Sequence, residues 1–482
     1  MRERPSGHRI QVDLGVEPQT VDSRLDVEAP FCIALFGDFS GRGHRGNGAG
    51  GALATHQSVV VDRDTLDETI ARLRPELSVR LAGERDPGVR VQFNALEDFH
   101  PDRLYERLTL FEGVRELRRR LVEPTPRTQP RASPSAPPPS APLEGDLLDH
   151  IVQQSQVSGA AEERPPLEGG DLQAYLNRIV APHLVPAADP RRQAVLAELD
   201  AAAADGVRAL LHLAEFQALE ALWRGVRLLT QGVESDAEVR LYLFDVTKAD
   251  LADDQRENRD ARSSRIYRLL AVPAGAPESG WGALGGLYSF GPDAADLTLL
   301  GYLGTVAGLV GAPWISAADP RLAGCDGIHT TPDAPDWAAD IPPEWQAVRR
   351  LPVARWIGLA MPRFLLRLPY GKRGSRCEFL PFEELSESPL HDEYLWGNPA
   401  LACLLLLIQS VAESGRPLHP GMNLEIGGLR AESLLSERAL ERILDHGLMP
   451  LVSIRDTDRI RLVRFQSVAD PTAALGGPWG RG

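Results

Sequence analysis

The densest group of side chains that could do chemistry lies at residues 363–398. Its cationic members are Arg363, Arg367, Lys372, Arg373 and Arg376, and its acidic members are Glu383, Glu384, Asp392 and Glu393. The cations alone could bind phosphate or nucleic acid, and the acids alone could form a solvated face. Because guanidinium groups match carboxylates well and complementary charge fixes the register between partners, we expect the two groups to pair with each other or across a subunit interface. The neighbouring Tyr394 and Trp396 are either core residues or interface anchors.

Motifs for catalysis or for cofactor binding are not evident. The glycine-rich stretch at residues 37–51 follows an apolar run, as a phosphate-binding loop would, but it lacks the Gly-Lys-Ser/Thr ending. Ser40 stands one place late for a nucleophile elbow. No His-Glu-x-x-His occurs, and the four cysteines lie far apart without metal-ligand spacing. We therefore expect no catalytic residue, no cofactor and no metal site, and a protein that is not an enzyme.

The cationic group must be positioned by a strand and a loop. Alternation along a strand at residues 363–368 would place Phe364, Leu366 and Leu368 on one face and the two arginines on the other. A proline and a glycine follow directly and would end this strand. A second turn signal, Asn398-Pro399, opens the apolar run at residues 400–408, which we interpret as part of a buried helix.

The length and composition of the chain limit the classes of protein to which it can belong. The 482 residues are enough for two or three domains with sizeable cores. The net charge of −15 argues against a general nucleic-acid binder. The N-terminus has no apolar segment typical of a signal peptide, and the longest apolar run is too short to span a bilayer. We therefore expect a cytoplasmic protein without membrane insertion and without a nucleic-acid partner.

The first region, residues 8–122, has the pattern of a compact α+β unit. An alternating strand carries Ile10, Val12, Leu14 and Val16, and it could pair within its domain or be donated to the sheet edge of a neighbour. A buried strand at 31–36, a helix at 64–73, and strands at 77–81 and 89–93 follow. A helix from Phe99 to Leu121 completes the unit, since its apolar residues keep helical spacing.

Residues 123–170 form a linker rich in proline, serine and alanine, which cannot build a core of its own. It contains one short amphipathic segment, with the apolar residues Leu147, Leu148, Ile151 and Val152. An isolated helix of this length is marginal in water. It is therefore either docked on the rest of the chain or available to a partner.

The second region, residues 171–470, alternates helices and strands, which indicates a mixed α/β domain. Its predicted helices are at 172–180, 193–203, 207–231, 251–270, 296–310, 400–413 and 436–446, and its predicted strands are at 239–244, 281–290, 314–317, 356–359 and 364–368. Ser436 is expected to cap the last helix, and Gly447 to end it. A hairpin should follow around Asp456, and the tail from Ala473 is expected to fray.

Several motifs carry a resemblance to a known family. Residues 216–225 (Phe-Gln-Ala-Leu-Glu-Ala-Leu-Trp-Arg-Gly), Asp319-Pro320, residues 363–370, residues 394–399 and residues 447–451 occur in an order that resembles the large subunit of the type VI secretion contractile sheath. The turn at residues 37–41 and the segment at residues 98–102 resemble the small subunit of the same sheath. The chain therefore looks like a small-subunit region fused to a large-subunit region that stops earlier than in the family.

The resemblance implies a structural protein that stores energy in subunit packing. The implied partners are copies of itself or other sheath subunits, with the inner tube, the baseplate and an AAA+ unfoldase as further candidates. In the family, the unfoldase recognises an amphipathic helix similar to the one at residues 147–152. A second interpretation is a cap, a baseplate-proximal component or an adaptor that binds sheath subunits without polymerising.

Overall fold

The structure is a computed structural model that describes residues 29–45, 58–79, 89–122, 190–233, 238–271, 277, 279–338, 341–415, 417–419 and 421–479. The chain divides into two compact units, Met1–Glu112 with Ala201–Gly482, and Gly113–Asp200. Three predicted segments lie outside the described residues. They are the strand with Ile10, Val12, Leu14 and Val16, the helix with Leu147, Leu148, Ile151 and Val152, and the helix at 172–180.

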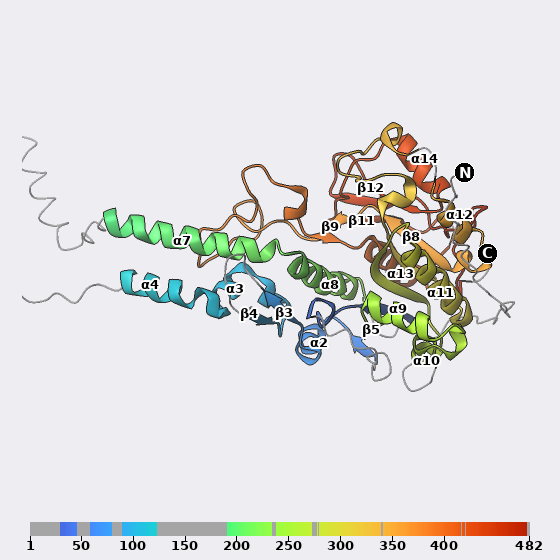
Figure 1. Ribbon diagram of the computed structural model, residues 1–482, viewed down its shortest axis with the longest axis horizontal. Coiled ribbons are helices and arrows are strands. Elements are labelled where there is room, and N and C mark those ends of the chain that lie inside the picture. Colours follow the sequence, from blue (N-terminus) through green and yellow to red (C-terminus); the bar gives the residue numbers. More distant parts are fainter. Residues whose placement is uncertain are drawn as a thin grey trace, which may run out of the picture. The chain divides into compact units, whose positions relative to one another are not determined.

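A nine-stranded mixed sheet forms the centre of the larger unit, in the order β11-β13-β12-β8-β7-β6-β1-β5-β2. Figure 1 labels β5, β8, β11 and β12 of this sheet. Its strands are β1 Phe31–Gly37, β2 Val59–Val61, β5 Val239–Asp245, β6 Ala283–Phe290, β7 Trp314–Ala318, β8 Ile357–Met361, β11 Glu425–Gly427, β12 Met449–Ser453 and β13 Arg459–Leu462. Strands β12 to β5 run parallel, and antiparallel strands form both edges. This sheet, with helices packed on it, confirms the predicted α/β class.

Strand β1 brings the two predicted regions into one sheet. It is an unbroken apolar run and every residue in it is buried, which is typical of a parallel strand covered on both faces. Phe36 lies opposite Phe244 of β5, and Ala34 lies opposite Leu284 of β6. A strand from the first region therefore lies between two strands from the second.

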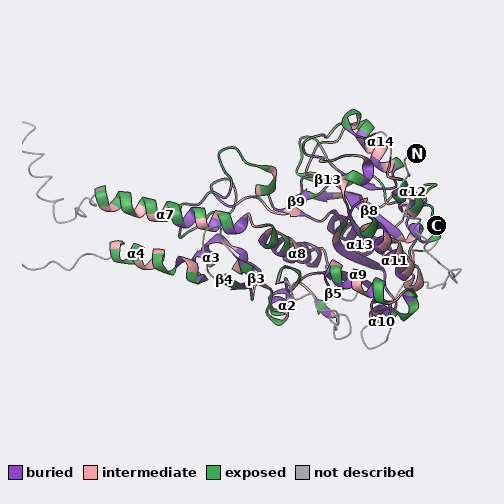
Figure 2. Ribbon diagram, viewed as in Figure 1, coloured by how far each residue is buried: buried purple, intermediate pink, exposed green. Residues whose placement is uncertain are grey.

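Helices α11 (Ala294–Val310) and α13 (Pro399–Ser414) cover opposite faces of the sheet. Successive residues of a strand point to opposite faces, and Gly285 and Gly286 of β6 show this directly. A Cβ on Gly285 would lie 2.5 Å from Leu404 of α13, whereas one on Gly286 would lie 2.3 Å from Trp314, which belongs to the core beneath α11. Helix α13 is buried along most of its length, as its apolar sequence predicts (Figure 2).

The first region adds a small layer that shares its core with helix α8 (Ala214–Gln231). Its elements are α2 Leu66–Leu73, the antiparallel pair β3 Glu76–Val79 and β4 Val89–Gln92, and α3 Pro101–Arg107. Phe93 and Phe99 stack with ring centroids 4.1 Å apart, and Phe216 of α8 meets both rings edge-on. The aromatic core of this layer is thus built from both predicted regions.

The smaller unit contains parts of two helices, α4 (Glu112–Val122) and α7 (Pro190–Leu211). Arg118 of α4 forms an ion pair with Asp200 of α7, at 2.8 Å between Nε and Oδ1. Three apolar residues of this unit are exposed, Leu117, Val122 and Val195, by 43% to 59%.

Some predicted helices are wrong in extent. The helix expected from Phe99 to Leu121 is interrupted at Leu108, whose backbone is extended, so that Leu108 and Phe111 both reach the core. The helix expected at 251–270 is two helices, α9 Lys248–Glu257 and α10 Arg265–Ala271. The cause is Asp254, a fully buried residue whose carboxylate accepts the backbone N–H groups of Arg265 and Ile266 and so begins the second helix.

The remaining elements are α12 Pro343–Arg349, α14 Glu437–Asp445, β9 Phe364–Leu365 and β10 Trp396–Gly397. The boundary predicted between helices near residue 205 falls instead at Leu213, between α7 and α8. The expected fraying from Ala473 is wrong for the described part of the tail, because Leu475 is buried and the Gly476 N–H donates to the Arg355 carbonyl. Among the described helices, none combines the length and apolarity needed to cross a membrane.

Candidate functional site

Arg367 is the centre of a buried charge network. The strand predicted at 363–368 is wrong in length, since β9 ends at Leu365 after pairing with β10. Phe364 is buried but Leu368 is 61% exposed, so these apolar residues do not share one face. The chain instead turns the Arg367 side chain inward, where it is 10% exposed. Ion pairing, not alternation, therefore sets the direction of this side chain.

The guanidinium of Arg367 binds two carboxylates at once. Its Nε and Nη2 donate to Glu220 Oε1 and Oε2 at 2.8 and 3.2 Å. Its Nη1 and Nη2 donate to Glu384 Oε2 and Oε1 at 2.7 and 2.8 Å. Both carboxylates are almost fully buried, and the guanidinium also lies 4.1 Å from the centre of the Tyr370 ring. Paired bidentate contacts of this kind are among the strongest that arginine forms.

Helix α8 completes the network. Arg224, one turn after Glu220, donates from Nε to Glu220 Oε1 at 2.6 Å and from Nη2 to the Tyr370 hydroxyl at 2.7 Å. Burial opposes ionisation of Glu220, but Arg367 and Arg224 together hold the pKa of that carboxyl below its usual range. Burial raises the pKa of Tyr370. The two arginines and the two glutamates therefore balance in charge inside the protein.

The loop that joins β9 to β10, residues 366–395, is held at two further points. The Tyr370 N–H donates to Glu384 Oε2 at 2.7 Å, which closes the loop on itself. The N–H groups of Glu378 and Phe379 donate to the Asp102 carboxylate at 2.9 and 3.2 Å. Asp102 lies in the first turn of α3, so a residue of the first region holds a loop of the second.

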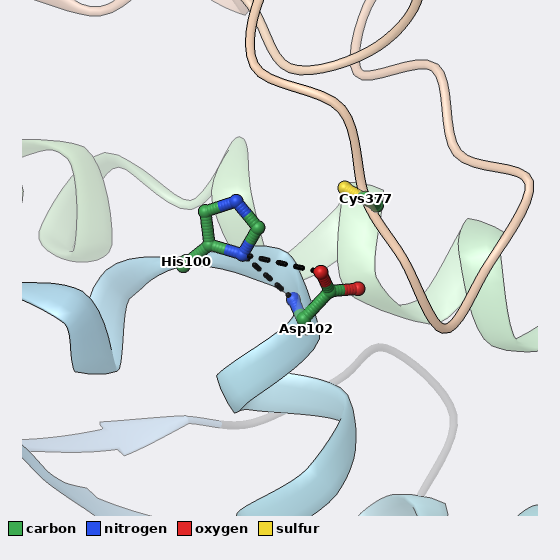
Figure 3. Close-up of side chains that lie close together, drawn as sticks. All are labelled: His100, Asp102 and Cys377. Atoms are coloured by element: carbon green, nitrogen blue, oxygen red, sulfur yellow. Dashed lines mark hydrogen bonds and ion pairs between the residues drawn. The ribbon is translucent and has the colours of Figure 1, made fainter.

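His100, Asp102 and Cys377 lie together at this point, as Figure 3 shows. The three side chains are of types that bind metals, but they already have other roles. His100 Nδ1 accepts the Asp102 N–H at 3.2 Å and caps α3. Burial, reinforced by nearby carboxylates, raises the pKa of the Cys377 thiol to about 12. The group therefore attaches the loop to α3 with a neutral thiol beside it.

The structure places the other predicted interface residues on and around the same loop. Arg363 pairs with Glu432, at 2.6 Å between Nη2 and Oε1. Lys372 and Glu383 lie 3.8 Å apart, and both are exposed. Arg373 is also exposed. The side chain of Asp392 is 95% exposed, and Glu393 accepts the N–H and hydroxyl of Ser386.

Sequence reasoning missed Glu220, Arg224, Asp102 and Glu432 as members of the site. Glu220 and Arg224 had a detectable signal, because charged residues four apart stand on an otherwise apolar face of α8. Asp102 and Glu432 had none, since their partners lie 276 and 69 residues away in the chain.

A crevice of about 770 Å³ opens at the carboxyl ends of the parallel strands, where α/β proteins usually bind ligands. Its lining includes Asp38 after β1, Asp319 after β7 and Arg363 after β8. Asp38 accepts the N–H groups of Arg42 and Gly43, at 2.8 Å each, so the amides that a phosphate-binding loop would offer are engaged within the chain.

Comparison with known proteins finds matches to two families. Residues 2–128 match the type VI secretion system VipA family, and residues 193–419 match the VipB family, tail sheath N-terminal domain. The chain is also 28% identical over 316 residues to the type VI secretion system sheath protein TssC1 of Pseudomonas aeruginosa. That alignment covers 58% of this chain and 61% of the relative, so the chain spans about three fifths of the length of this protein.

Proposed function

We propose that the chain is a structural subunit of a contractile sheath, because it matches two type VI secretion families and is similar to a type VI secretion sheath protein. In this proposal one polypeptide supplies both the small-subunit and the large-subunit parts, and the assembled subunits form a contractile lattice in the cytoplasm. Its role is mechanical, without catalysis of its own. Its partners are copies of itself or other sheath subunits.

The observation that carries this proposal is the position of β1. Both edges of this strand are paired with strands from the region that matches the VipB family. If β1 were absent, the edges of β5 and β6 would expose unpaired backbone groups, which promote aggregation. Two hydrogen bonds also link the regions. The Trp223 indole N–H donates to the Phe39 carbonyl, and the Glu378 N–H donates to the Asp102 carboxylate. These contacts support a single folding unit made of both regions.

Assembly in this proposal uses the segment with Ile10, Val12, Leu14 and Val16 as a strand donated to a neighbouring sheet. The exposed charges of the 366–395 loop, Lys372, Arg373, Glu383 and Asp392, supply complementary contacts between subunits. The segment with Leu147, Leu148, Ile151 and Val152 would be available to an AAA+ unfoldase after contraction. The inner tube and the baseplate are further proposed partners.

Analytical ultracentrifugation tests the assembly. The full-length chain should sediment as large particles, alone or with other sheath subunits of the same locus, and deletion of residues 10–16 should leave single folded chains. A matched control replaces three residues of this segment that are not apolar, Gln11, Asp13 and Gly15, by serine and should assemble as the parent does. Equal assembly of the deletion variant would contradict the donated strand.

A further inference from the structure

Three metal-binding side chains converge at the wall of the crevice. His329 lies on the loop after β7, His391 begins a short turn of 3-10 helix at His391–Glu393, and Glu432 lies between β11 and α14. Their ligand atoms all lie within 4.8 Å of one another. His329 is exposed and, like Glu432, lines the crevice, whereas the side chains of His391 and Glu432 are 17% and 4% exposed. The group therefore has a buried floor and one open side.

The ring nitrogen of His391 at the centre of this group lacks a hydrogen bond. Its Nε2 is buried, and no described residue forms a hydrogen bond with it. Glu432 Oε1 is 2.9 Å away, and the two form an ion pair only when the imidazole is protonated. A buried polar atom without a partner costs free energy. A metal ion beside the ring would give this nitrogen a partner and would share Glu432 Oε1 with Arg363 Nη2.

The surroundings hold these side chains in place. Asp392 Oδ1 lies 3.4 Å from His391 Nδ1, the position in which a carboxylate orients a metal-binding imidazole. The ring of His391 is stacked between His329, at 3.9 Å, and Trp396, at 4.9 Å. Glu432 Oε2 accepts the backbone N–H and the Nε of Arg363, at 3.0 and 3.1 Å. Glu432 Oε1 accepts Arg363 Nη2 at 2.6 Å and also faces His391. Arg363 therefore holds the carboxylate by both oxygens, and a metal ion would share Oε1 with this guanidinium.

A second group of candidate ligands consists of His100, Asp102 and Cys377 (Figure 3). The ligand atoms of His100 and Asp102 already have hydrogen-bond partners. His100 Nδ1 accepts the Asp102 N–H, and both oxygens of Asp102 accept backbone N–H groups of the 366–395 loop. A metal ion there would have to displace these bonds. At the crevice wall, by contrast, the buried Nε2 of His391 forms no hydrogen bond, and only Glu432 Oε1 would be shared, with Arg363.

We propose that His329, His391 and Glu432 bind a divalent transition-metal ion, with Zn²⁺ as the ion that two imidazoles and one carboxylate fit best. The three ligands leave at least one coordination position open towards the crevice, which water or a ligand atom from outside the chain can fill. A bound ion would connect three segments that are far apart in the sequence. This metal site does not depend on the proposed assembly. A chain that binds no metal could still assemble, and a chain that does not assemble could still bind the ion.

Cobalt titration of the full-length, metal-depleted chain tests the site. Co²⁺ should bind with one equivalent per chain and give visible d–d absorption of a four- or five-coordinate ion without a thiolate-to-metal charge-transfer band. Zn²⁺ should displace it and raise the melting temperature. A charge-transfer band that disappears in Cys377→Ser would place the ion at the other group, and the absence of saturable binding would also overturn the proposal.

Variants assign the ligands. His329→Ala, at an exposed position, should weaken Zn²⁺ binding at least about tenfold and abolish the thermal shift, and Asp392→Asn should weaken binding about tenfold through the orientation of His391. His44→Ala is the matched control, because His44 is exposed and lines the same crevice but lies outside the group. Unchanged affinity in His329→Ala, or an equal loss in His44→Ala, would contradict the assignment.

Discussion

The guanidinium of Arg367 and the carboxylate of Glu220 form two hydrogen bonds, of 2.8 and 3.2 Å, between the 366–395 loop and helix α8. Both residues belong to motifs that resemble the sheath family, although they lie 147 positions apart. Burying a charge is costly unless it is paired. The contact therefore joins these two distant motifs, and each supplies the charge that the other needs inside the protein.

Replacement of Arg367 by methionine should strongly destabilise the protein. The change leaves Glu220 and Glu384 buried with only Arg224 to balance them, and loss of one partner of a buried ion pair costs about 3–5 kcal/mol. The free energy of unfolding from urea denaturation measures this effect. Lys372→Ala, which removes an exposed pair on the same loop, should change stability by less than about 1 kcal/mol.

The double variant Arg367→Met with Glu220→Gln tests the pairing itself. It leaves Arg224 with Glu384, so the buried charges balance again, and its loss of stability should be smaller than the sum of the two single losses by at least about 0.5 kcal/mol. Strictly additive losses would contradict the account of this network.

Replacement of Asp102 by asparagine should loosen the 366–395 loop. An amide offers one acceptor oxygen, whereas the two carboxylate oxygens accept the N–H groups of Glu378 and Phe379 separately. Hydrogen exchange should become faster at residues 377–380, and the free energy of unfolding should fall by about 1.5–3 kcal/mol. Arg103→Ala, on the exposed side of the same helix, serves as the control. Unchanged exchange at the loop would show that Asp102 does not hold it.

The stability of the protein should depend on pH through His100. Burial lowers the pKa of His100, and the nearby Arg224 and Arg367 lower it further, although Asp102 and Glu97 oppose the shift. Because the unfolded state then binds more protons, stability is complete above the ordinary histidine pKa of about 6.5 and falls as the pH decreases towards the lower pKa of the folded state.

His100→Asn measures that contribution, since asparagine also caps a helix but does not titrate. Between about pH 7.5 and about pH 5.5, the parent should lose more unfolding free energy than this variant. Parallel curves for the parent and His100→Asn would refute the role of His100.

Replacement of Gly285 by alanine should destabilise the contact between the sheet and α13. The added methyl group would lie 2.5 Å from Leu404 and 3.0 Å from Leu35, and overpacking of this kind costs about 1–3 kcal/mol. Gly113→Ala is the matched control, because no described atom lies within 4 Å of the new methyl group in helix α4. That change should be neutral or should stabilise the helix by up to about 1 kcal/mol. Equal thermal stabilities of the two variants would contradict the close packing at Gly285.

Local sequence patterns predicted the elements whose formation depends on neighbouring residues in the chain. The apolar runs became β1, β7, β8 and α13 because burial on both faces needs continuous apolar sequence. Ser436 caps α14 by accepting the Ala439 N–H, and Gly447, with φ of +76°, follows its end, as predicted. The hairpin of β12 and β13 turns at Asp456, also as predicted.

Relations between distant residues could not be predicted in the same way. Nothing local in β1 indicates that it pairs with β5 and β6, since parallel pairing depends on strands separated by long connections. The direction of Arg367 was predicted from alternation, but its carboxylate partners on α8 and in the loop decided it. The group of His329, His391 and Glu432 was missed because sequence motifs detect ligands at short spacing.

Negative-stain electron microscopy of the purified full-length chain, alone and mixed with other sheath subunits from the same locus, tests the central claim most directly. A structural sheath subunit should form tubules or stacked rings, or should enter the walls of tubules in the mixture. Discrete particles that bind only at tubule ends would instead identify a cap or an adaptor. Absence of any association in both samples would contradict a role in the sheath.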